Sequence, residues 1–199
     1  MRPCNFGAVV ATRRDGIQRR DALLDAALRC FTERGVLATG IEDIRKAAGA
    51  SPSSVYHLFG GLAGIVEALL IRTFERLLAH LVARLGEADT AESAVRALVD
   101  GHLEWVVAHP DEARFMYQAM AVELAGDSRA TVLAAKDGFK RPLHDQLARF
   151  DLPPWPPLTL EFVLLGPAHE ACRRYFAGAD VDLDWMRRHL PDLAWRSLD

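Results

Sequence analysis

Residues 39–59 read TGIEDIRKAAGASPSSVYHLF and predict two short helices joined by a tight turn. Gly49 stands between the two helices, where the left-handed backbone of a tight turn suits glycine. Ser51 and Pro52 are residue types that begin a helix well, the serine as a side-chain cap and the proline as the first helical residue. Residues 41–59 are therefore a candidate helix-turn-helix, a motif whose second helix enters the major groove of DNA at its N-terminal end.

The rest of the chain has the same helical character. Apolar residues recur at spacings of three and four through most of the 199 residues, and no alternating strand pattern stands out. Proline and glycine are concentrated at a few break points, above all at residues 153–157. We expect an all-α protein of about nine helices. They are expected at about residues 18–34, 41–48, 52–58, 63–85, 91–108, 110–124, 126–150, 158–177 and 183–198.

The composition is that of an ordinary globular chain. Half of the residues are hydrophobic and 26% are charged, and no apolar run is long enough to cross a bilayer. The three cysteines are odd in number and far apart, which argues against a disulfide framework and favours a cytoplasmic protein without a membrane partner. Residues 1–65 carry nine basic and six acidic side chains, a modestly basic end suited to nucleic acid.

The helix-turn-helix and its surroundings resemble the DNA-binding domain of TetR-family transcriptional regulators over about residues 18–78. That family has a leading helix that ends in Phe-x-x-x-Gly, then a threonine, an Ile-x-x-Ile pair, Ala-Gly-x-Ser and a hydrophobe-Tyr-x-x-Phe signature. The matching residues are Phe31, Gly35, Thr39, Ile41, Ile44, Ala48, Gly49, Ser51, Val55, Tyr56 and Phe59. More loosely, HPDEARFMYQAM, LLGPAHEACRRYFAG and AWRSL resemble phrases of the ligand-binding domains in one branch of the family.

The resemblance implies a domain plan and a function. Residues 1–16 are expected to form a flexible arm, residues 17–77 a three-helix DNA-binding domain that shares a long fourth helix, and residues 78–199 an effector-binding and dimerisation domain. The expected protein is a bacterial homodimer, commonly a repressor, released from a pseudo-palindromic DNA operator by a small, largely apolar effector. We find no catalytic motif and no ligand set with zinc spacing, so we expect neither enzyme activity nor a cofactor or metal site.

The same resemblance assigns the DNA contacts. Serine, threonine and tyrosine hydroxyls would bond phosphates, and the start of the second helix would face base edges. Arg45 departs from the family, which usually has a small residue at this position, and an arginine turned outward here would reach phosphate. The predicted DNA-binding residues are Thr39, Gly40, Arg45, Ser51, Pro52, Ser53, Ser54, Tyr56, His57 and Gly61. Simple packing of Tyr56 and simple surface exposure of His57 remain alternatives.

Two departures from the family pattern lie at the flanks of this motif. Leu62 stands where the family commonly has a phosphate-binding lysine, and Gly40 stands where it usually has a hydroxyl residue. We therefore expect a weak, salt-sensitive operator affinity. A helical dimeric adaptor that has lost specific DNA binding remains the alternative function.

Two further sets of residues are predicted in the C-terminal part. An effector pocket is expected from aromatic, methionine and histidine side chains, although burial in an ordinary core is the alternative for each. Its predicted residues are His102, Trp105, Val106, His109, Phe115, Met116, Met120 and Phe139. A dimer face is expected on the eighth helix together with either the ninth or the seventh, with burial inside one chain as the alternative. Its predicted residues are Phe162, Leu165, Gly166, His169 and Cys172.

Overall fold

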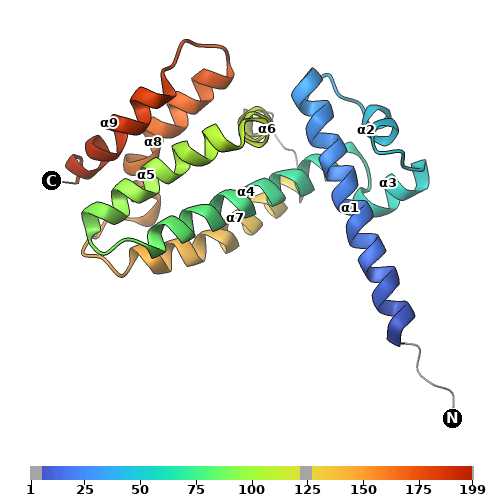
Figure 1. Cartoon of the computed structure of the whole chain (residues 1–199), viewed down its shortest axis with the longest axis horizontal. Coiled ribbons are helices and arrows are strands. Elements are labelled where there is room, and N and C mark those ends of the chain that lie inside the picture. Colours follow the sequence, from blue (N-terminus) through green and yellow to red (C-terminus); the bar gives the residue numbers. More distant parts are fainter. Residues whose placement is uncertain (1–5, 122–126, 199) are drawn as a thin grey trace. The chain divides into compact units, whose positions relative to one another are not determined.

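The computed structural model describes residues 6–121 and 127–198, whose regular secondary structure is entirely α-helical. The helices within these two ranges are α1 (Phe6–Arg34), α2 (Ile41–Ala47), α3 (Pro52–Phe59), α4 (Leu62–Gly86), α5 (Ala91–Ala108), α6 (Pro110–Ala121), α7 (Asp127–Leu147), α8 (Pro157–Phe176) and α9 (Leu183–Arg196). The prediction of an all-α chain is confirmed (Figure 1). Among these helices none alone is long and apolar enough to span a membrane; α3 and α4 meet that test only as a pair bent by 58°.

Two compact units divide the chain within α4. The N-terminal unit ends at Leu69 and the C-terminal unit begins at Leu70. The sequence-based division, after residue 77, falls in the same helix. Each unit is described by itself below.

Every helix of the N-terminal unit contributes apolar side chains to its core. Leu24 and Phe31 come from α1, Ile44 from α2, Val55 from α3 and Ile65 from α4, and each is at most 1% exposed. Full burial of such a side chain contributes roughly 1.5–3 kcal/mol to folding. These five residues therefore hold the two helices of the helix-turn-helix against α1 and the start of α4.

Two glycines with positive φ close the turns that the sequence predicts. Gly35 has a φ of 84° immediately after α1, and its N–H donates to the Phe31 carbonyl oxygen at 2.8 Å. Gly49 has a φ of 61° between α2 and α3. Residues with a Cβ atom rarely adopt these angles, so glycine at both positions sets where the helices end.

The N-terminal arm differs from its prediction. The sequence predicts a flexible arm over residues 1–16, whereas α1 begins at Phe6 and continues to Arg34. No proline follows Pro3 in this stretch, and glycine inside a helix costs only about 1 kcal/mol relative to alanine, so Gly16 does not end the helix. The first five residues of the predicted arm lie outside the described residues.

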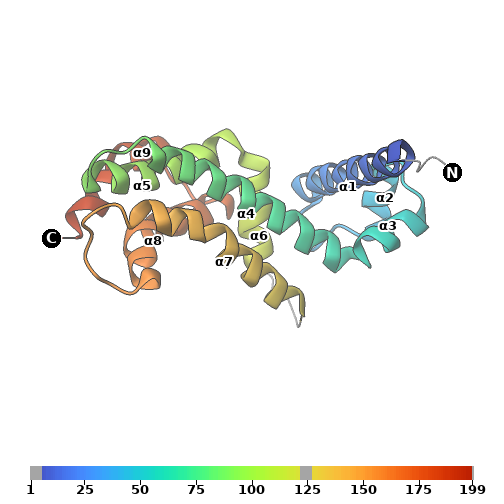
Figure 2. The same ribbon diagram turned by 90° about the horizontal axis from the view of Figure 1, so that it is seen from below.

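In the C-terminal unit, α5 is the central helix. It packs against α9, α8 and α6 (Figures 1 and 2), and its buried side chains include Val95, Leu103 and Trp105. Both views also show α4 and α7 running side by side. Residues 151–156, between α7 and α8, are not helical, as their prolines predict. This arrangement leaves α4, α5, α7 and α8 around a common interior.

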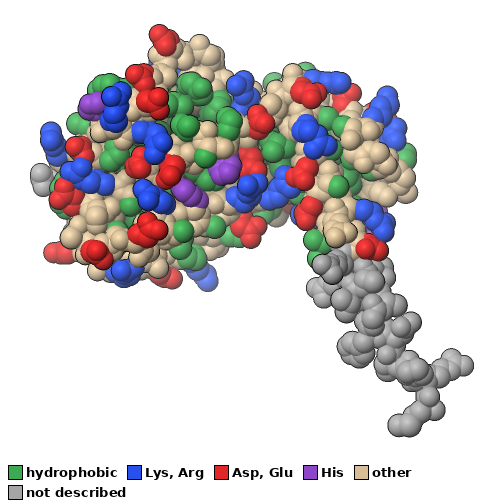
Figure 3. Space-filling view, viewed as in Figure 1, with side chains coloured by type: hydrophobic (Ala, Val, Ile, Leu, Met, Phe, Trp, Pro, Cys, Tyr) green, Lys and Arg blue, Asp and Glu red, His purple; other side chains and the backbone are tan. Residues whose placement is uncertain are grey.

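Ion pairs tie the later part of α4 to α5 and α6. Arg76 pairs with Glu112 of α6. Arg84 approaches two carboxylates of α5, Asp100 at 3.5 Å and Glu104 at 3.3 Å. Apart from Glu112, these side chains are partly exposed. On the face of this unit seen in Figure 3, basic and acidic side chains are interspersed, as such pairing requires.

Candidate nucleic-acid interface and ligand cavity

The start of α3 is specified by serine and proline side chains. Ser51 is the N-cap, with its Oγ accepting a hydrogen bond from the Ser54 N–H at 3.3 Å. The Ser51 hydroxyl also lies within hydrogen-bond distance of the Ser53 and Ser54 hydroxyls, at 3.1 and 2.8 Å. Pro52 is the first helical residue. The cluster preforms a helix N-terminus whose free N–H groups and hydroxyls are suited to an anion such as phosphate.

The outward face of α3 carries four of the predicted DNA contacts. Pro52, Ser53, Tyr56 and His57 are exposed, whereas Val55 is buried. Positions four apart lie on the same face of a helix, so these residues form one continuous surface. Tyr56 is 57% exposed, which rules out the alternative that it is simply a packing residue.

Thr39 does not have the side-chain role predicted for it. Its hydroxyl is within hydrogen-bond distance of two carbonyl oxygens, that of Gly35 at 2.8 Å and that of Cys30 at 3.2 Å, and the residue is 3% exposed. A hydroxyl has a single proton to donate, and here it is used inside the unit. Thr39 therefore joins the end of α1 to the start of α2 instead of presenting a hydroxyl to phosphate.

Gly40 lies at the N-cap of α2 and makes no side-chain cap, as predicted. Its N–H instead donates to a carboxylate oxygen of Asp43 at 2.9 Å. This hydrogen bond, with help from the nearby Arg34 guanidinium, lowers the pKa of Asp43 below its usual value. The start of α2 is thus closed by an acidic side chain in its first turn.

Arg45 is also engaged within the unit. Its Nε donates to the Glu42 carboxylate at 2.9 Å, and one of its terminal nitrogens donates to the Ala50 carbonyl oxygen at 3.1 Å. The arginine therefore bridges α2 to the turn before α3. We therefore expect Arg45 to support the turn, and its phosphate contact stays a prediction.

Arg45→Met is accordingly expected to lower the free energy of unfolding by about 1 kcal/mol, the usual contribution of one such hydrogen bond. The slope of log K against log salt for DNA binding should stay unchanged, because no phosphate contact is lost. Denaturant unfolding and a salt titration of binding measure the two effects. A slope reduced by about 0.9, the value for one neutralised phosphate, would restore Arg45 as a DNA contact.

The corner between α3 and α4 is built from glycines. Gly60 caps α3 with a φ of 70°, and Gly61 follows with a φ of 150°. Gly64 lies in the first turn of α4, where an added Cβ would come within 1.9 Å of the Phe59 carbonyl oxygen. The sequence analysis missed Gly64, whose only signal is its membership of the Gly60–Gly61–x–x–Gly64 run. Gly61 is half-buried at this corner, and its contact with DNA stays a prediction.

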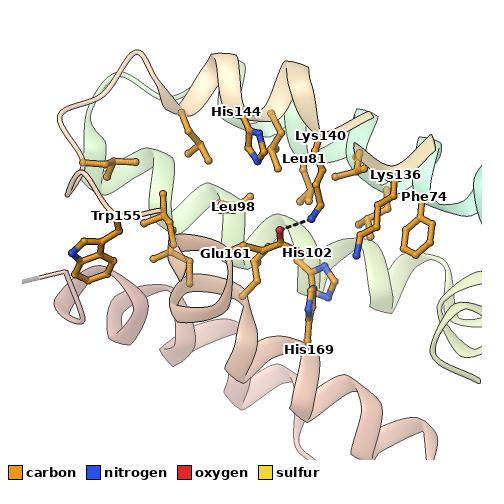
Figure 4. Close-up of a pocket in the computed structure, with 18 of the residues that line it drawn as sticks. Phe74, Leu81, Leu98, His102, Lys136, Lys140, His144, Trp155, Glu161 and His169 are labelled. Atoms are coloured by element: carbon orange, nitrogen blue, oxygen red, sulfur yellow. Dashed lines mark hydrogen bonds and ion pairs between the residues drawn. The ribbon is translucent and has the colours of Figure 1, made fainter. Parts of the chain in front are cut away.

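A cavity of about 400 Å³ lies within the C-terminal unit. It is lined by residues of α4, α5, α6, α7 and α8 and of the connector between α7 and α8 (Figure 4). Most of its lining is apolar, and its size falls in the range of small-molecule sites. The predicted effector pocket therefore has a candidate space in this unit.

Three of the eight predicted pocket residues line this cavity, namely His102, Met116 and Met120. The other five lie elsewhere. Trp105, Val106 and Phe115 are buried in the core, the tilted ring of His109 lies against Trp105 with ring centres 5.2 Å apart, and Phe139 is a half-buried residue outside the lining. For Trp105 and Val106 the reason is that α5 is buried on most of its circumference, so apolar spacing alone does not distinguish its core face from its cavity face.

The polar residues of the cavity were mostly missed by the sequence analysis. His102 lies 3.0 Å from the Tyr117 hydroxyl through Nε2, and its ring centre is 4.6 Å from that of His169. Burial lowers the pKa of His102 well below its usual value and that of His169 to about 4, so both are neutral near pH 7. Lys140 of α7 pairs with Glu161 of α8 in the same lining. From the sequence alone, the charged residues of α7 and α8 would be expected to face solvent.

The predicted dimer face of α8 is divided between two sides of the helix. Leu165 and His169 line the cavity and Cys172 is fully buried, where burial raises its thiol pKa to about 11. These three residues are therefore used inside the chain, which was the alternative for this face. Phe162 is 63% exposed, and an added Cβ at Gly166 would meet open space.

Large apolar side chains are exposed on this helix and on α9. Leu158 and Phe162 are four residues apart on α8, and Trp185 and Leu193 are eight apart on α9. Trp185 also stacks on His189, with ring centres 4.2 Å apart. We call the exposed residues Leu158, Phe162, Trp185 and Leu193 the outer apolar stripe.

Known proteins resemble this chain in sequence. The signature of the family described as "Bacterial regulatory proteins, tetR family" matches residues 23–69. The HTH-type transcriptional repressor KstR2 of Rhodococcus jostii is 31% identical over 179 residues, 89% of this chain and 76% of that protein. The HTH-type transcriptional regulator BetI of Rhizobium meliloti is 41% identical over 85 residues, 41% of this chain and only 40% of BetI. The chain belongs to the TetR family of bacterial regulatory proteins, and these relatives are regulators, not enzymes.

Solved structures show the same fold. The fatty acid degradation regulator FadR of Bacillus halodurans has a TM-score of 0.74 at 18% identity, covering 90% of this chain and 99% of FadR. FadR of Bacillus subtilis, in complex with stearoyl-CoA, has a TM-score of 0.73 at 15% identity and covers 87% and 96%. At these identities the likeness concerns the fold alone.

Proposed function

We propose that this protein is a DNA-binding transcriptional repressor that reads a pseudo-palindromic operator through α3. The observation that carries this proposal is the outward face of α3, where Ser53, Tyr56 and His57 are exposed beside the capped helix start at Ser51. Such a helix presents hydroxyls and free N–H groups to phosphates and side chains to base edges. Family membership, including that of the repressor KstR2, supports the same function in the bacterial cytoplasm.

A pseudo-palindrome requires two reading helices, so the proposed repressor is a homodimer. Half-sites on DNA are spaced by about 34–36 Å, one helical turn. We assign the two-fold contact to the outer apolar stripe of α8 and α9, which an isologous contact would remove from water in both copies at once. Phe162 and Gly166 keep their predicted place at this face.

The cavity of the C-terminal unit is the proposed effector site. Its largely apolar lining suits a small, largely apolar molecule. FadR of Bacillus subtilis, a neighbour in fold, was solved with stearoyl-CoA, a molecule with a long apolar chain. Release of the operator would require that the effector bind the DNA-incompetent state more tightly than the DNA-bound state.

Tyr56→Phe is expected to weaken binding to the operator by about tenfold, because it removes one hydroxyl contact to phosphate and nothing else. Ser53→Ala should weaken binding as well. Fluorescence anisotropy with the intergenic DNA beside the protein's own gene measures both. Tyr175→Phe is the matched control, since Tyr175 is an exposed tyrosine of α8, and its operator affinity should equal that of the wild type.

The same assay separates the two candidate functions. Specific binding that is lost in the α3 variants supports the repressor. If the wild-type protein shows no specific binding even at low salt, where phosphate attraction is strongest, the helical dimeric adaptor is the better description. The observation that supports this second function is Leu62, which stands where the family commonly has a phosphate-binding lysine.

A further inference from the structure

The cavity of the C-terminal unit has a polar part and an apolar part. The polar part contains Lys136, Lys140, Glu161, His102 and His169. At the other end, the connector after α7 contributes Leu152, Pro153 and Trp155. Figure 4 shows Trp155 at the end of the cavity away from Lys136 and Phe74. A molecule that fills this space therefore meets the charged side chains away from Trp155.

The polar part carries an excess of positive charge. Its lining includes two lysines and one glutamate, so these side chains sum to one net positive charge. Lys140 pairs with Glu161, which neutralises both. The uncompensated charge is that of Lys136.

The contact described for the Lys136 ammonium is with an aromatic ring, and the charges of Lys140, Glu161 and Asp137 also act on it. Its ammonium lies 5.1 Å from the centre of the Phe74 ring, a cation–π contact. Among the described side chains, no carboxylate is within ion-pair distance of this ammonium, and it donates no hydrogen bond to them. Burial, followed by the neighbouring charge of Lys140, lowers the pKa of Lys136. A cation held in an apolar space is costly unless a counter-charge joins it, so the site is complementary to an anion.

We propose that Lys136 binds the carboxylate of an amphipathic monocarboxylic acid, whose apolar body extends through the cavity toward Trp155. This inference rests on the proposed effector function and adds the chemical class of the effector. The buried Nδ1 atom of His102, which also has no hydrogen-bond partner within the described part of the chain, supplies a neutral polar group to the same lining.

The charge of the lining favours a free acid over a thioester. The cavity volume of about 400 Å³ lies in the range of small-molecule sites. A free acid brings its own charged end into this space. A thioester of the same acid has no carboxylate at that position, so its acyl end offers Lys136 no counter-charge.

Isothermal titration calorimetry on the full-length protein tests the ligand class. The three probes share one apolar chain: decanoate, decan-1-ol and decanoyl-CoA. Decanoate should bind at least about tenfold more tightly than decan-1-ol, since only the acid supplies a counter-charge to Lys136. Equal affinity of the acid and the alcohol, tighter binding of decanoyl-CoA, or no measurable binding of decanoate overturns the proposal.

Variants at position 136 test the residue. Lys136→Met removes the charge but keeps an unbranched side chain only one atom shorter, and it should weaken decanoate binding by about tenfold or more, while leaving decan-1-ol binding unchanged. Lys136→Arg should retain most of the affinity for decanoate. Arg141→Met is the matched control, because Arg141 is an exposed cation on the same helix. If Lys136→Met binds decanoate as the wild type does, the carboxylate lies elsewhere and the proposal is wrong.

These outcomes are separable from those of the proposed function. Decanoate that binds through Lys136 but leaves operator binding unchanged supports the ligand class and contradicts the effector role. A neutral apolar compound that releases the operator equally from wild type and Lys136→Met supports the effector role and contradicts the ligand class. Far-ultraviolet circular dichroism verifies that each variant is folded.

Discussion

Gly64→Ala is expected to destabilise the N-terminal unit by about 3 kcal/mol or more. The new Cβ would lie 1.9 Å from the carbonyl oxygen and 3.0 Å from the carbonyl carbon of Phe59. These are backbone atoms, which have no rotamer that would relieve the overlap. The end of α3 or the first turn of α4 must therefore move, and Val55 and Ile65 are buried on those two helices.

The tryptophans provide an internal reference for this measurement, because all four lie in the C-terminal unit. Chemical denaturation followed by circular dichroism should show helix loss at a lower denaturant concentration in Gly64→Ala. Tryptophan fluorescence should follow the wild-type curve. Gly16→Ala is the matched control: its Cβ meets open space, and alanine in a helix interior stabilises by up to about 1 kcal/mol. A wild-type denaturation curve for Gly64→Ala would mean that the corner accommodates a methyl group.

Lys140→Met is expected to destabilise the C-terminal unit by about 2–3 kcal/mol. The change leaves the Glu161 carboxylate in a largely apolar cavity without its ion-pair partner. Complete burial of an unpaired charge would cost more, but the two side chains are 13% and 19% exposed and Lys136 is nearby, so we take a lower figure. Tryptophan fluorescence, which reports on this unit, should show unfolding at a lower denaturant concentration than in the wild type.

A double variant separates charge from packing. Lys140→Met combined with Glu161→Leu removes both charges and should recover most of the lost stability, because an apolar pair of similar volume commonly replaces a buried ion pair without cost. Arg141→Met should have little effect. If the double variant is as unstable as Lys140→Met, the loss comes from packing and not from the isolated carboxylate.

The stability contributed by this ion pair also depends on pH. Burial raises the pKa of Glu161, but the hydrogen bond and charge of Lys140 outweigh it, so the pKa of Glu161 is lowered in the folded protein. A carboxyl group whose pKa is lowered by folding stabilises the folded state, and this contribution is complete at pH values above the pKa of the unfolded chain, about 4.3 for glutamate. The contribution is lost as the pH falls through the pKa of the folded protein. The difference between wild type and Lys140→Met should therefore shrink in acid below about pH 4.

Local signals account for what the sequence predicted well. Gly49 and the Ser51–Pro52 pair act within one or two turns of chain, so they place the helix-turn-helix without knowledge of the rest of the molecule. The outward face of α3 follows from the same short stretch. The hydrogen bonds that Thr39 and Arg45 make to carbonyl oxygens of neighbouring turns could not be predicted from the sequence, because these partners are visible only once the chain is folded.

Side-chain direction in the C-terminal unit required the tertiary structure. The eighth helix is apolar on more than one side, so its sequence did not distinguish the inward Leu165 and Cys172 from the outward Phe162. Lys136 and Glu161 were missed because charged residues on a helix usually face water. The angle at which helices cross decides which side faces a cavity, and no local pattern encodes it.

The ion pairs that tie α4 to α5 and α6 affect how the salt dependence of this protein should be interpreted. Arg76 and Arg84 are partly exposed, so dissolved ions screen their attraction to Glu112, Asp100 and Glu104. The same ions compete with the protein for DNA phosphates. Added salt would thus loosen the anchoring of α4 while it weakens operator binding, and a single salt titration sums the two effects. The number of phosphate contacts must therefore be taken from the difference in salt slope between two variants that share these ion pairs.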